Sequence, residues 1–270
     1  MFHTIVASRS PDMDNVTALA IGSALAERFN GTLIPADLAQ SPSGERAAPP
    51  APDAEQADLI LLAPWRRDLT EIVWYPHTTS WALLRLHTPL LFWPATPTST
   101  TLLEGHQPLI VVPLDGHTHA ERAISYACAL AEAFGGEVAL THVVPAILSS
   151  RLLGARASTI RRSRLTRIHE VVSYLHGLRS VTAEQTTAPV TTKILLGEPG
   201  SALVRFAKRQ RVGAIVMTTH SRAHDGRFFA GAVATQVVRQ ATTPTLLLPL
   251  GAETELTPTF ARMPAIPVTP

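Results

Sequence analysis

The stretch PLIVVPLDGHTHAERAISYACALAEAFGGEVALTHVV, residues 108–144, carries the pattern of a strand, a helix and a second strand. Residues 108–114 form a continuous apolar run, which is typical of a strand buried on both faces of a parallel sheet. Residues 119–135 then place apolar side chains at helical spacing, and a Gly-Gly pair gives the signal that ends the helix. Residues 137–144 return to a strand pattern, so a parallel strand pair with a crossover helix is predicted.

The same alternation continues to residue 250. Predicted helices at 157–178, 200–211 and 231–241 alternate with predicted strands at 191–197, 213–217 and 243–249. Strands that alternate with helices in this way form a parallel sheet covered by helices on both faces. The fold class predicted for this part of the chain is therefore α/β.

An internal repeat extends this prediction to the first part of the chain. ALAERFNGTL at 24–33 resembles ALAEAFGGEV at 129–138, and this offset of 105 residues holds without gaps back to the start. ADLILLAPW at 57–65 resembles VGAIVMTTH at 212–220, where the offset is 155. The chain thus contains two copies of one unit, and the first copy lacks about 50 residues in its middle.

The repeat predicts how the chain is divided. Strands are expected at 3–8, 32–37, 58–63 and 89–93 of the first copy, with helices near 14–29 and 77–87. A proline- and alanine-rich loop, 40–56, takes the place of the third strand and its helix. The predicted domains are a truncated unit at 1–94, a linker at 95–106, a complete unit at 107–250 and a proline-rich tail at 251–270.

Composition limits the classes of protein to consider. With 46% hydrophobic and 16% charged residues among 270, a large core is expected. The net charge of +2 is too small to indicate nucleic acid binding, and no apolar run is long enough to span a membrane. Cys128 is the single cysteine, which excludes an internal disulfide and favours a reducing compartment. We therefore expect a soluble, cytoplasmic protein.

The second copy resembles the universal stress protein family across 107–250. The resemblance rests on IVVPLDGHTHAERAISYACALA, ALTHVV, LLGEPGSALVRFA, IVMTTHSR and GAVATQVVRQATTPTLLLP. The first copy is similar in part, so the whole chain resembles a tandem form with a truncated first domain. The resemblance implies two adenine-nucleotide-hydrolase-like (Rossmann-like) sandwiches with parallel sheets, arranged as an intramolecular pseudo-dimer. It also implies ATP as a ligand in one subgroup of the family, and a homo-dimer as a further assembly.

The family's nucleotide signature is a glycine, two residues, a glycine, nine residues, then a glycine and a serine or threonine. In this chain these positions carry Thr218, Ser221, Gly231 and Ala232, so the spacing survives but one of four residues matches. Thr218 is β-branched and poorly suited to a positive φ, if the loop needs one. Ala232 lacks the hydroxyl, although its backbone N–H remains at a helix N-terminus, which favours anions.

The resemblance also implies further contacts to the nucleotide in the second copy. The matching positions are Pro113, Asp115 and Val143, with His220, Arg222 and Val233 in or beside the signature. Asp115 ends the first strand of its unit, where doubly wound folds place ligands, but it is also a common type of turn residue. His220 and Arg222 are equally compatible with an exposed loop. ATP is therefore expected in the second unit alone.

The first copy is predicted not to bind a nucleotide. Its signature positions carry Ala63, Arg66, Pro76 and His77, and Ser10 replaces the aspartate, with Asp12 and Asp14 nearby. Aromatic side chains surround this region: Trp65, Trp74, Tyr75 and Trp81. Packing against the second unit is the favoured role for them, and stacking on a ligand is the alternative.

Other chemistry finds little support in the sequence. The 11 histidines are scattered, so no metal site is predicted, and no motif of a catalytic serine or of a Walker loop occurs. Seven arginines between 151 and 179 suggest a solvated basic helix face or, alternatively, a surface for an acidic partner. Cys128 is expected to be a core thiol.

The sequence thus predicts a non-catalytic stress-response module in which the strands at 89–93 and 244–249 pair with each other. Two alternatives stay open: a protein-interaction module that binds no nucleotide, and a slow ATP hydrolase. An obvious general base or metal-binding carboxylate is missing from the signature, which argues against the hydrolase.

Overall fold

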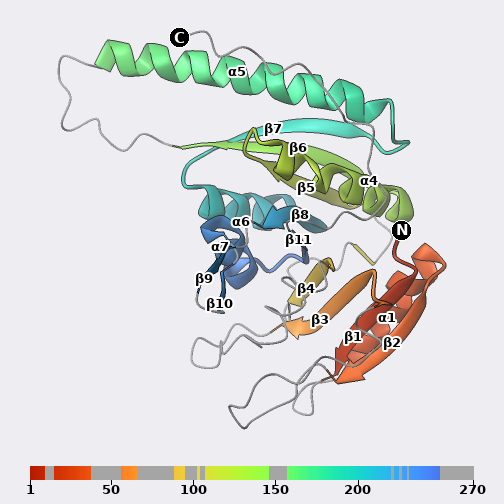
Figure 1. Ribbon diagram of the computed structural model, residues 1–270. Helices are drawn as coiled ribbons and strands as arrows, with labels where there is room; N and C mark the ends of the chain where they lie inside the picture. The colour runs from red at the N-terminus through yellow and green to blue at the C-terminus, as the bar shows by residue number, and fades with distance from the viewer. Residues whose placement is uncertain are drawn as a thin grey trace.

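The computed structural model describes residues 1–9, 15–37, 56–65, 88–94, 102–103, 107–145, 157–219, 222–224, 227–229 and 231–249 (Figure 1). These residues form a nine-stranded sheet in the order β2-β1-β3-β4-β11-β8-β5-β6-β7. The first unit contributes four of its strands and the second unit contributes five. The α/β fold class predicted from the sequence is confirmed, and the two units share one continuous sheet rather than stacking as separate layers.

The second unit has the alternation that the sequence predicts. Its strands are β5 (Leu109–Leu114), β6 (Glu137–Val144), β7 (Val190–Leu196), β8 (Ala214–Thr219) and β11 (Thr245–Pro249). Its helices are α3 (Thr118–Glu121), α4 (Ala123–Phe134), α5 (Ala157–Ala183), α6 (Pro199–Gln210) and α7 (Ala232–Gln240). The helix predicted at 119–135 is divided at Arg122, and a short hairpin of β9 (Arg222–His224) and β10 (Arg227–Phe229) precedes α7.

The first unit repeats part of this plan. Its elements are β1 (Thr4–Arg9), α1 (Asn15–Phe29), β2 (Thr32–Asp37), β3 (Leu59–Trp65) and β4 (Leu90–Pro94). Their order in the sheet, β2-β1-β3-β4, matches β6-β5-β8-β11 of the second unit. Among the described residues no strand of the first unit corresponds to β7.

The two units meet at β4 and β11, which contain the segments expected to pair. β4 runs antiparallel to β11, whereas within each unit the strands of the nine-stranded sheet are parallel to their neighbours. The carboxyl ends of the two sets of strands therefore lie at opposite edges of the sheet. A ligand site at the carboxyl edge of the second unit is consequently built from the second unit's own strands.

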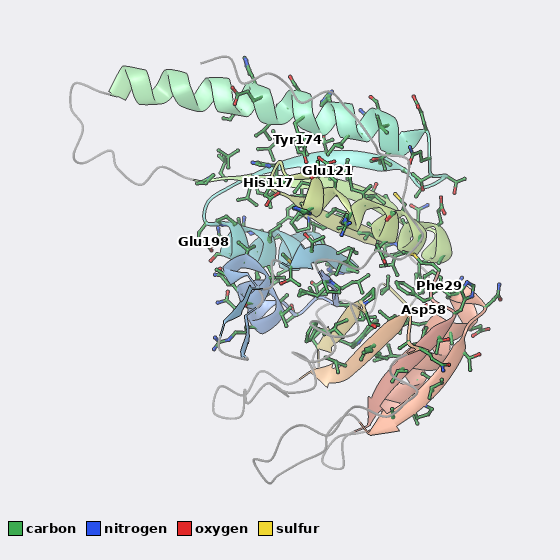
Figure 2. The ribbon with its side chains drawn as sticks, in the orientation of Figure 1. Phe29, Asp58, His117, Glu121, Tyr174 and Glu198 are labelled. Carbon is green, nitrogen blue, oxygen red and sulfur yellow. The ribbon has the colours of Figure 1, made fainter. Side chains whose placement is uncertain are left out.

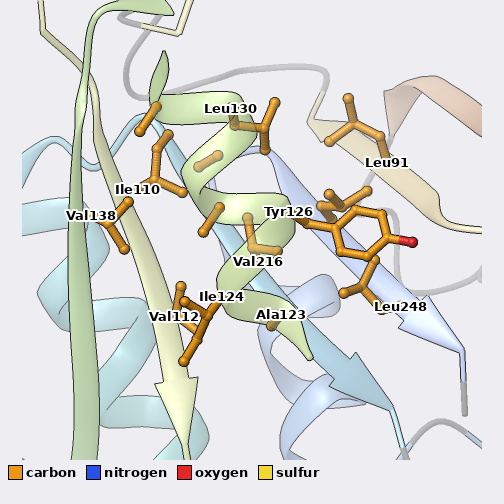
Figure 3. Packing of buried hydrophobic residues seen from close by; sticks show 14 of the residues in the cluster. Leu91, Ile110, Val112, Ala123, Ile124, Tyr126, Leu130, Val138, Val216 and Leu248 are labelled. Carbon is orange, nitrogen blue, oxygen red and sulfur yellow. The ribbon is translucent and has the colours of Figure 1, made fainter. Parts of the chain in front are cut away.

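Each face of the sheet carries a core that runs through both units. On one face, α1, α4 and α5 pack over residues such as Ile5, Leu91, Ile110 and Leu248. In Figure 3, Tyr126 extends from α4 toward Leu91 of β4 and Leu248 of β11, across the junction of the two units. The other face is covered in the second unit by α6 and α7, which lie side by side (Figure 1).

An aromatic cluster adds a second contact between the units. The ring of Phe29 at the end of α1 lies 5.1 Å from Phe2 and 6.3 Å from Phe134 of α4, both in edge-on geometry. The Arg28 guanidinium lies 5.5 Å from the centre of the Phe134 ring. Such ring pairs and cation–π contacts stabilise packing beyond the area they bury.

Several predicted segments fall outside the described residues: the loop 40–55, the helix near 77–87 and the tail at 251–270. Of the predicted linker, 102–103 are described, and Leu102 is buried in the core with α1 and α4. No described helix is long and apolar enough to cross a membrane.

Candidate functional site

The carboxyl edge of the second unit begins with the turn after β5. Pro113 and Leu114 end the strand, and Gly116 has a φ of 90°, a left-handed conformation that favours glycine. The carboxylate oxygen Oδ1 of Asp115 accepts a hydrogen bond of 2.9 Å from the backbone N–H of His117. The Nδ1 atom of the His117 ring lies 3.3 Å from the same oxygen, and the Asp115 side chain is 50% exposed. Asp115 is therefore both a turn residue and accessible to a ligand.

A second carboxylate ties this edge to the long helix α5. The Tyr174 hydroxyl of α5 donates a hydrogen bond of 2.9 Å to Oε1 of Glu121 in α3, and His117 lies nearby (Figure 2). Burial raises the pKa of Tyr174 well above its usual range, and the negative charges of Glu121 and Asp115 raise it further. The phenol is thus a fixed hydrogen-bond donor that holds α3 against α5.

Strand alternation decides which predicted residues share a face. Val111 of β5, Ala139 of β6 and Met217 of β8 all pack in the core under α6 and α7. Pro113, Val143 and Thr219 lie an even number of residues further along these strands, so they face the same side. Val233, at the start of α7, packs against this core as well. The structure therefore brings Pro113, Val143 and Val233 to one face at one edge.

Thr218 lies on the opposite face of the sheet. Its β-branched side chain would be poorly suited to a positive φ, but this position does not need one. It is a residue of β8 in parallel register with Leu248 of β11. Among the described residues other than glycine, a positive φ occurs at Asn30 and Arg211 and not at Thr218. Because the strand continues through this position, the backbone conformation here does not require glycine.

The two helices on this face begin differently. The Glu198 carboxylate accepts hydrogen bonds from the backbone N–H groups of Gly200 (3.1 Å) and Ser201 (2.8 Å), which caps α6 (Figure 2). A hydrogen bond from the Ser201 side chain, together with these backbone bonds, lowers the pKa of Glu198. Gly231 precedes α7 and provides no side-chain cap. The first backbone N–H groups of α7, from Ala232 onward, thus receive no hydrogen bond from the side chain of their N-cap residue, whereas those of α6 do.

A hydrogen bond fixes the spacing between these helices. The Gln236 side-chain amide of α7 donates to the Ser201 hydroxyl of α6 over 2.9 Å. A side chain in place of the hydrogen of Gly200 would collide with Gln236, so the glycine permits the close approach. The start of α7 is therefore held in place through α6.

The loop between β8 and α7 is described only in part. The hairpin of β9 and β10 includes Arg222, and the sequence pattern had not predicted it. His220 and Ser221 lie outside the described residues, as do Ser10, Arg66, Pro76 and His77 of the first unit and the aromatic residues Trp74, Tyr75 and Trp81. Ala63 and Trp65 lie in β3.

One residue of this edge was missed by the sequence reasoning. Thr219, between the two signature positions at the end of β8, is 1% exposed, and its hydroxyl has no hydrogen-bond partner among the described residues. Strand alternation was the signal that would have separated it from Thr218. In the part of the chain that the structure describes, no cluster of three metal-binding side chains occurs.

Comparisons with known proteins agree with this architecture. The family model "Universal stress protein family" matches residues 109–249, just over half of the chain. A universal stress protein of Methanocaldococcus jannaschii is 26% identical over 52% of this chain and 80% of its own length. A universal stress protein of Thermus aquaticus is 30% identical over 52% of this chain and 96% of its own length.

A solved structure extends the likeness to both units. The crystal structure of a universal stress protein from Archaeoglobus fulgidus covers 92% of this chain and 99% of its own, with a TM-score of 0.58 at 13% sequence identity. At this identity the likeness concerns the fold. The chain belongs to the universal stress protein family.

Proposed function

We propose that the second unit binds an adenine nucleotide, with ATP as the ligand, and that the protein acts as a non-catalytic stress-response module. The proposal rests on one observation: apolar side chains and polar groups lie together at the carboxyl edge of the second unit. Val143 and Val233 offer apolar surface on the face that holds the start of α7. Ligand sites commonly combine apolar walls with a few placed polar groups.

The position of this edge in the fold supports the proposal. β5 and β8 are neighbours in the sheet, and the strand order runs outward in opposite directions from them. Doubly wound folds bind ligands in the crevice outside the carboxyl ends of such strands. Asp115 follows β5 at this point and is half exposed, so its carboxylate is available to accept hydrogen bonds from ribose hydroxyls.

The charge distribution of the helices supports the position of the phosphates. α7 begins at this edge, and its first N–H groups receive no bond from Gly231. The N-terminus of a helix carries a partial positive charge and favours phosphate groups. In α6 the corresponding N–H groups are bonded to the Glu198 carboxylate, so the start of α6 is the less favourable place for a phosphate group.

Two measurements test the proposal. Mass spectrometry of small molecules released from the purified protein should identify an adenine nucleotide, and titration calorimetry should give a measurable affinity for ATP. Absence of binding at millimolar ATP would refute the proposal and favour a protein-interaction module. Release of inorganic phosphate from ATP would favour the hydrolase.

A matched pair of variants tests the position of the site. Asp115→Ala removes a carboxylate at the edge of β5, and Glu184→Ala removes an exposed carboxylate just beyond α5. Asp115→Ala is expected to weaken ATP binding at least about fivefold, the worth of one hydrogen bond. Glu184→Ala is expected to bind as the unaltered protein does. Equal affinities for all three proteins would remove Asp115 from the site.

A further inference from the structure

Thr219 differs from two other buried threonines of the second unit, Thr141 and Thr245. The hydroxyl of Thr141 donates to the carbonyl of Ala139 over 3.0 Å, and that of Thr245 donates to the carbonyl of Thr243 over 3.2 Å. The Thr219 hydroxyl has no such partner among the described residues. Thr182 shares this feature, but it lies near the end of α5, which leads to the opposite edge of the sheet. A buried hydroxyl without a partner is unfavourable and calls for a functional explanation.

The position of Thr219 relative to α7 suggests that explanation. α7 ends toward the amino end of β8, because the four residues that follow it lead to β11, whose first residue, Thr245, is in parallel register with Ile215. From there α7 rises by about 14 Å, at 1.5 Å per residue. The four steps from Ile215 to Thr219 rise by about 13 Å. The start of α7 therefore lies toward the carboxyl end of β8, where Thr219 is, on the face that Thr219 shares with Met217.

We propose that the Thr219 hydroxyl donates a hydrogen bond to a phosphoryl oxygen of the bound nucleotide. In doing so it replaces the hydroxyl that the family's signature carries at the position of Ala232. Ala232 is exposed and has no polar side-chain atom, whereas Thr219 ends β8 with a buried hydroxyl that has no hydrogen-bond partner among the described residues. A hydrogen bond to a charged oxygen is stronger than one between neutral groups. This inference rests on the proposed nucleotide site and adds a residue to it.

The experiment compares ATP and adenosine by titration calorimetry on four proteins: the unaltered chain, Thr219→Val, Thr219→Ser and Thr245→Val. Thr219→Val keeps the shape and removes the hydroxyl, and Thr219→Ser keeps the hydroxyl. Thr245→Val is the matched control, since it removes a buried hydroxyl near the other end of the sheet. Thr219→Ala replaces Thr219→Val if the valine variant does not fold.

The expected result is selective. Thr219→Val should weaken ATP binding by about tenfold and leave adenosine binding unchanged, because adenosine has no phosphate. Thr219→Ser and Thr245→Val should bind ATP as the unaltered protein does. Ala232→Ser, added to Thr219→Val, should recover most of the lost affinity, because the hydroxyl is then supplied from the helix.

Three results would overturn the inference, and they are distinguishable. If the unaltered protein binds ATP and Thr219→Val binds it equally well, Thr219 is not a contact and the proposed nucleotide site stands. If Thr219→Val weakens ATP and adenosine alike, the hydroxyl acts on the fold and not on phosphate. If the unaltered protein binds neither ligand, the proposed function fails and the inference fails with it.

Discussion

Leu91 of β4 lies opposite Leu246 of β11 in antiparallel register, at the centre of the strand pair that joins the two units into one sheet. Both side chains are buried, at 2% and 1% exposure. They belong to the same core cluster as residues of α1 and α4, so the junction is continuous with the interior of each unit. A truncated unit is thus stabilised by the complete one.

Leu91→Ala should therefore destabilise the whole chain and not the first unit alone. The loss expected from a large-to-small change in a buried core is about 2–5 kcal/mol. Urea unfolding followed by fluorescence and circular dichroism is the measurement, and both signals should shift together in one transition. Leu196→Ala is the control, because Leu196 is 53% exposed on β7. Two separate transitions, with the later one unshifted, would mean that the units are independent.

Tyr174→Phe should weaken the attachment of α3 to α5. The variant loses the hydrogen bond that the Tyr174 hydroxyl donates to the Glu121 carboxylate. A hydrogen bond to a charged group contributes about 1.5 kcal/mol to the free energy of unfolding. Unfolding free energies of Tyr174→Phe, Glu121→Gln and the double variant form a double-mutant cycle. A coupling energy near zero would show that the bond contributes nothing to stability.

The free energy of unfolding should decrease at alkaline pH because of the buried Cys128 thiol. Burial raises the pKa of the Cys128 thiol to about 11, with a hydrogen bond from Thr186 opposing the shift and the Glu132 charge adding to it. An unfolded thiol ionises near about pH 8.5. Below that pH the contribution is fully present, and it is lost as the pH rises from there through the folded pKa.

The measurement is the unfolding free energy at several pH values between 8 and 11, for the unaltered chain and Cys128→Ala. The variant should show a shallower decline, because the single thiol is gone. Identical slopes for the two proteins would contradict the assigned pKa.

Glu198→Ala should cost about 1 kcal/mol of stability at neutral pH, the usual effect of losing a helix cap. The carboxylate is bonded to two backbone N–H groups, and the Ser201 side chain and these groups lower its pKa. Its contribution is therefore present above about pH 4.3, the unfolded value, and is lost as the pH falls through the folded pKa. Thermal unfolding at pH 7 and pH 3 measures the difference, which should be smaller at pH 3. A difference that grows with acidity would contradict the cap.

The sequence predicted the framework of the fold because the signals were local. Continuous apolar runs such as 108–114 marked buried parallel strands, and the Gly-Gly pair marked the end of α4, where Gly135 adopts a left-handed conformation. The repeat indicated which strands of the first unit occupy equivalent places in the sheet.

What the sequence did not predict depends on geometry between distant segments. The predicted strand at 213–217 ends before Thr218 and Thr219, so alternation could separate the two residues only once β8 was seen to extend to Thr219. The hairpin of β9 and β10 has strands of three residues, too short for a periodic pattern. Leu102 falls in the predicted linker at 95–106, although tertiary packing buries it.

The central claim is that an adenine nucleotide lies at the carboxyl edge of the second unit, with its base beside Val143 and its phosphates at the start of α7. Photolabelling with 8-azido-ATP, followed by peptide mapping, tests it most directly. The account predicts labelled peptides from the end of β6, because the azide is on the adenine, and it predicts that excess ATP suppresses the label. Labelling confined to the first unit, or labelling that ATP does not suppress, would contradict it.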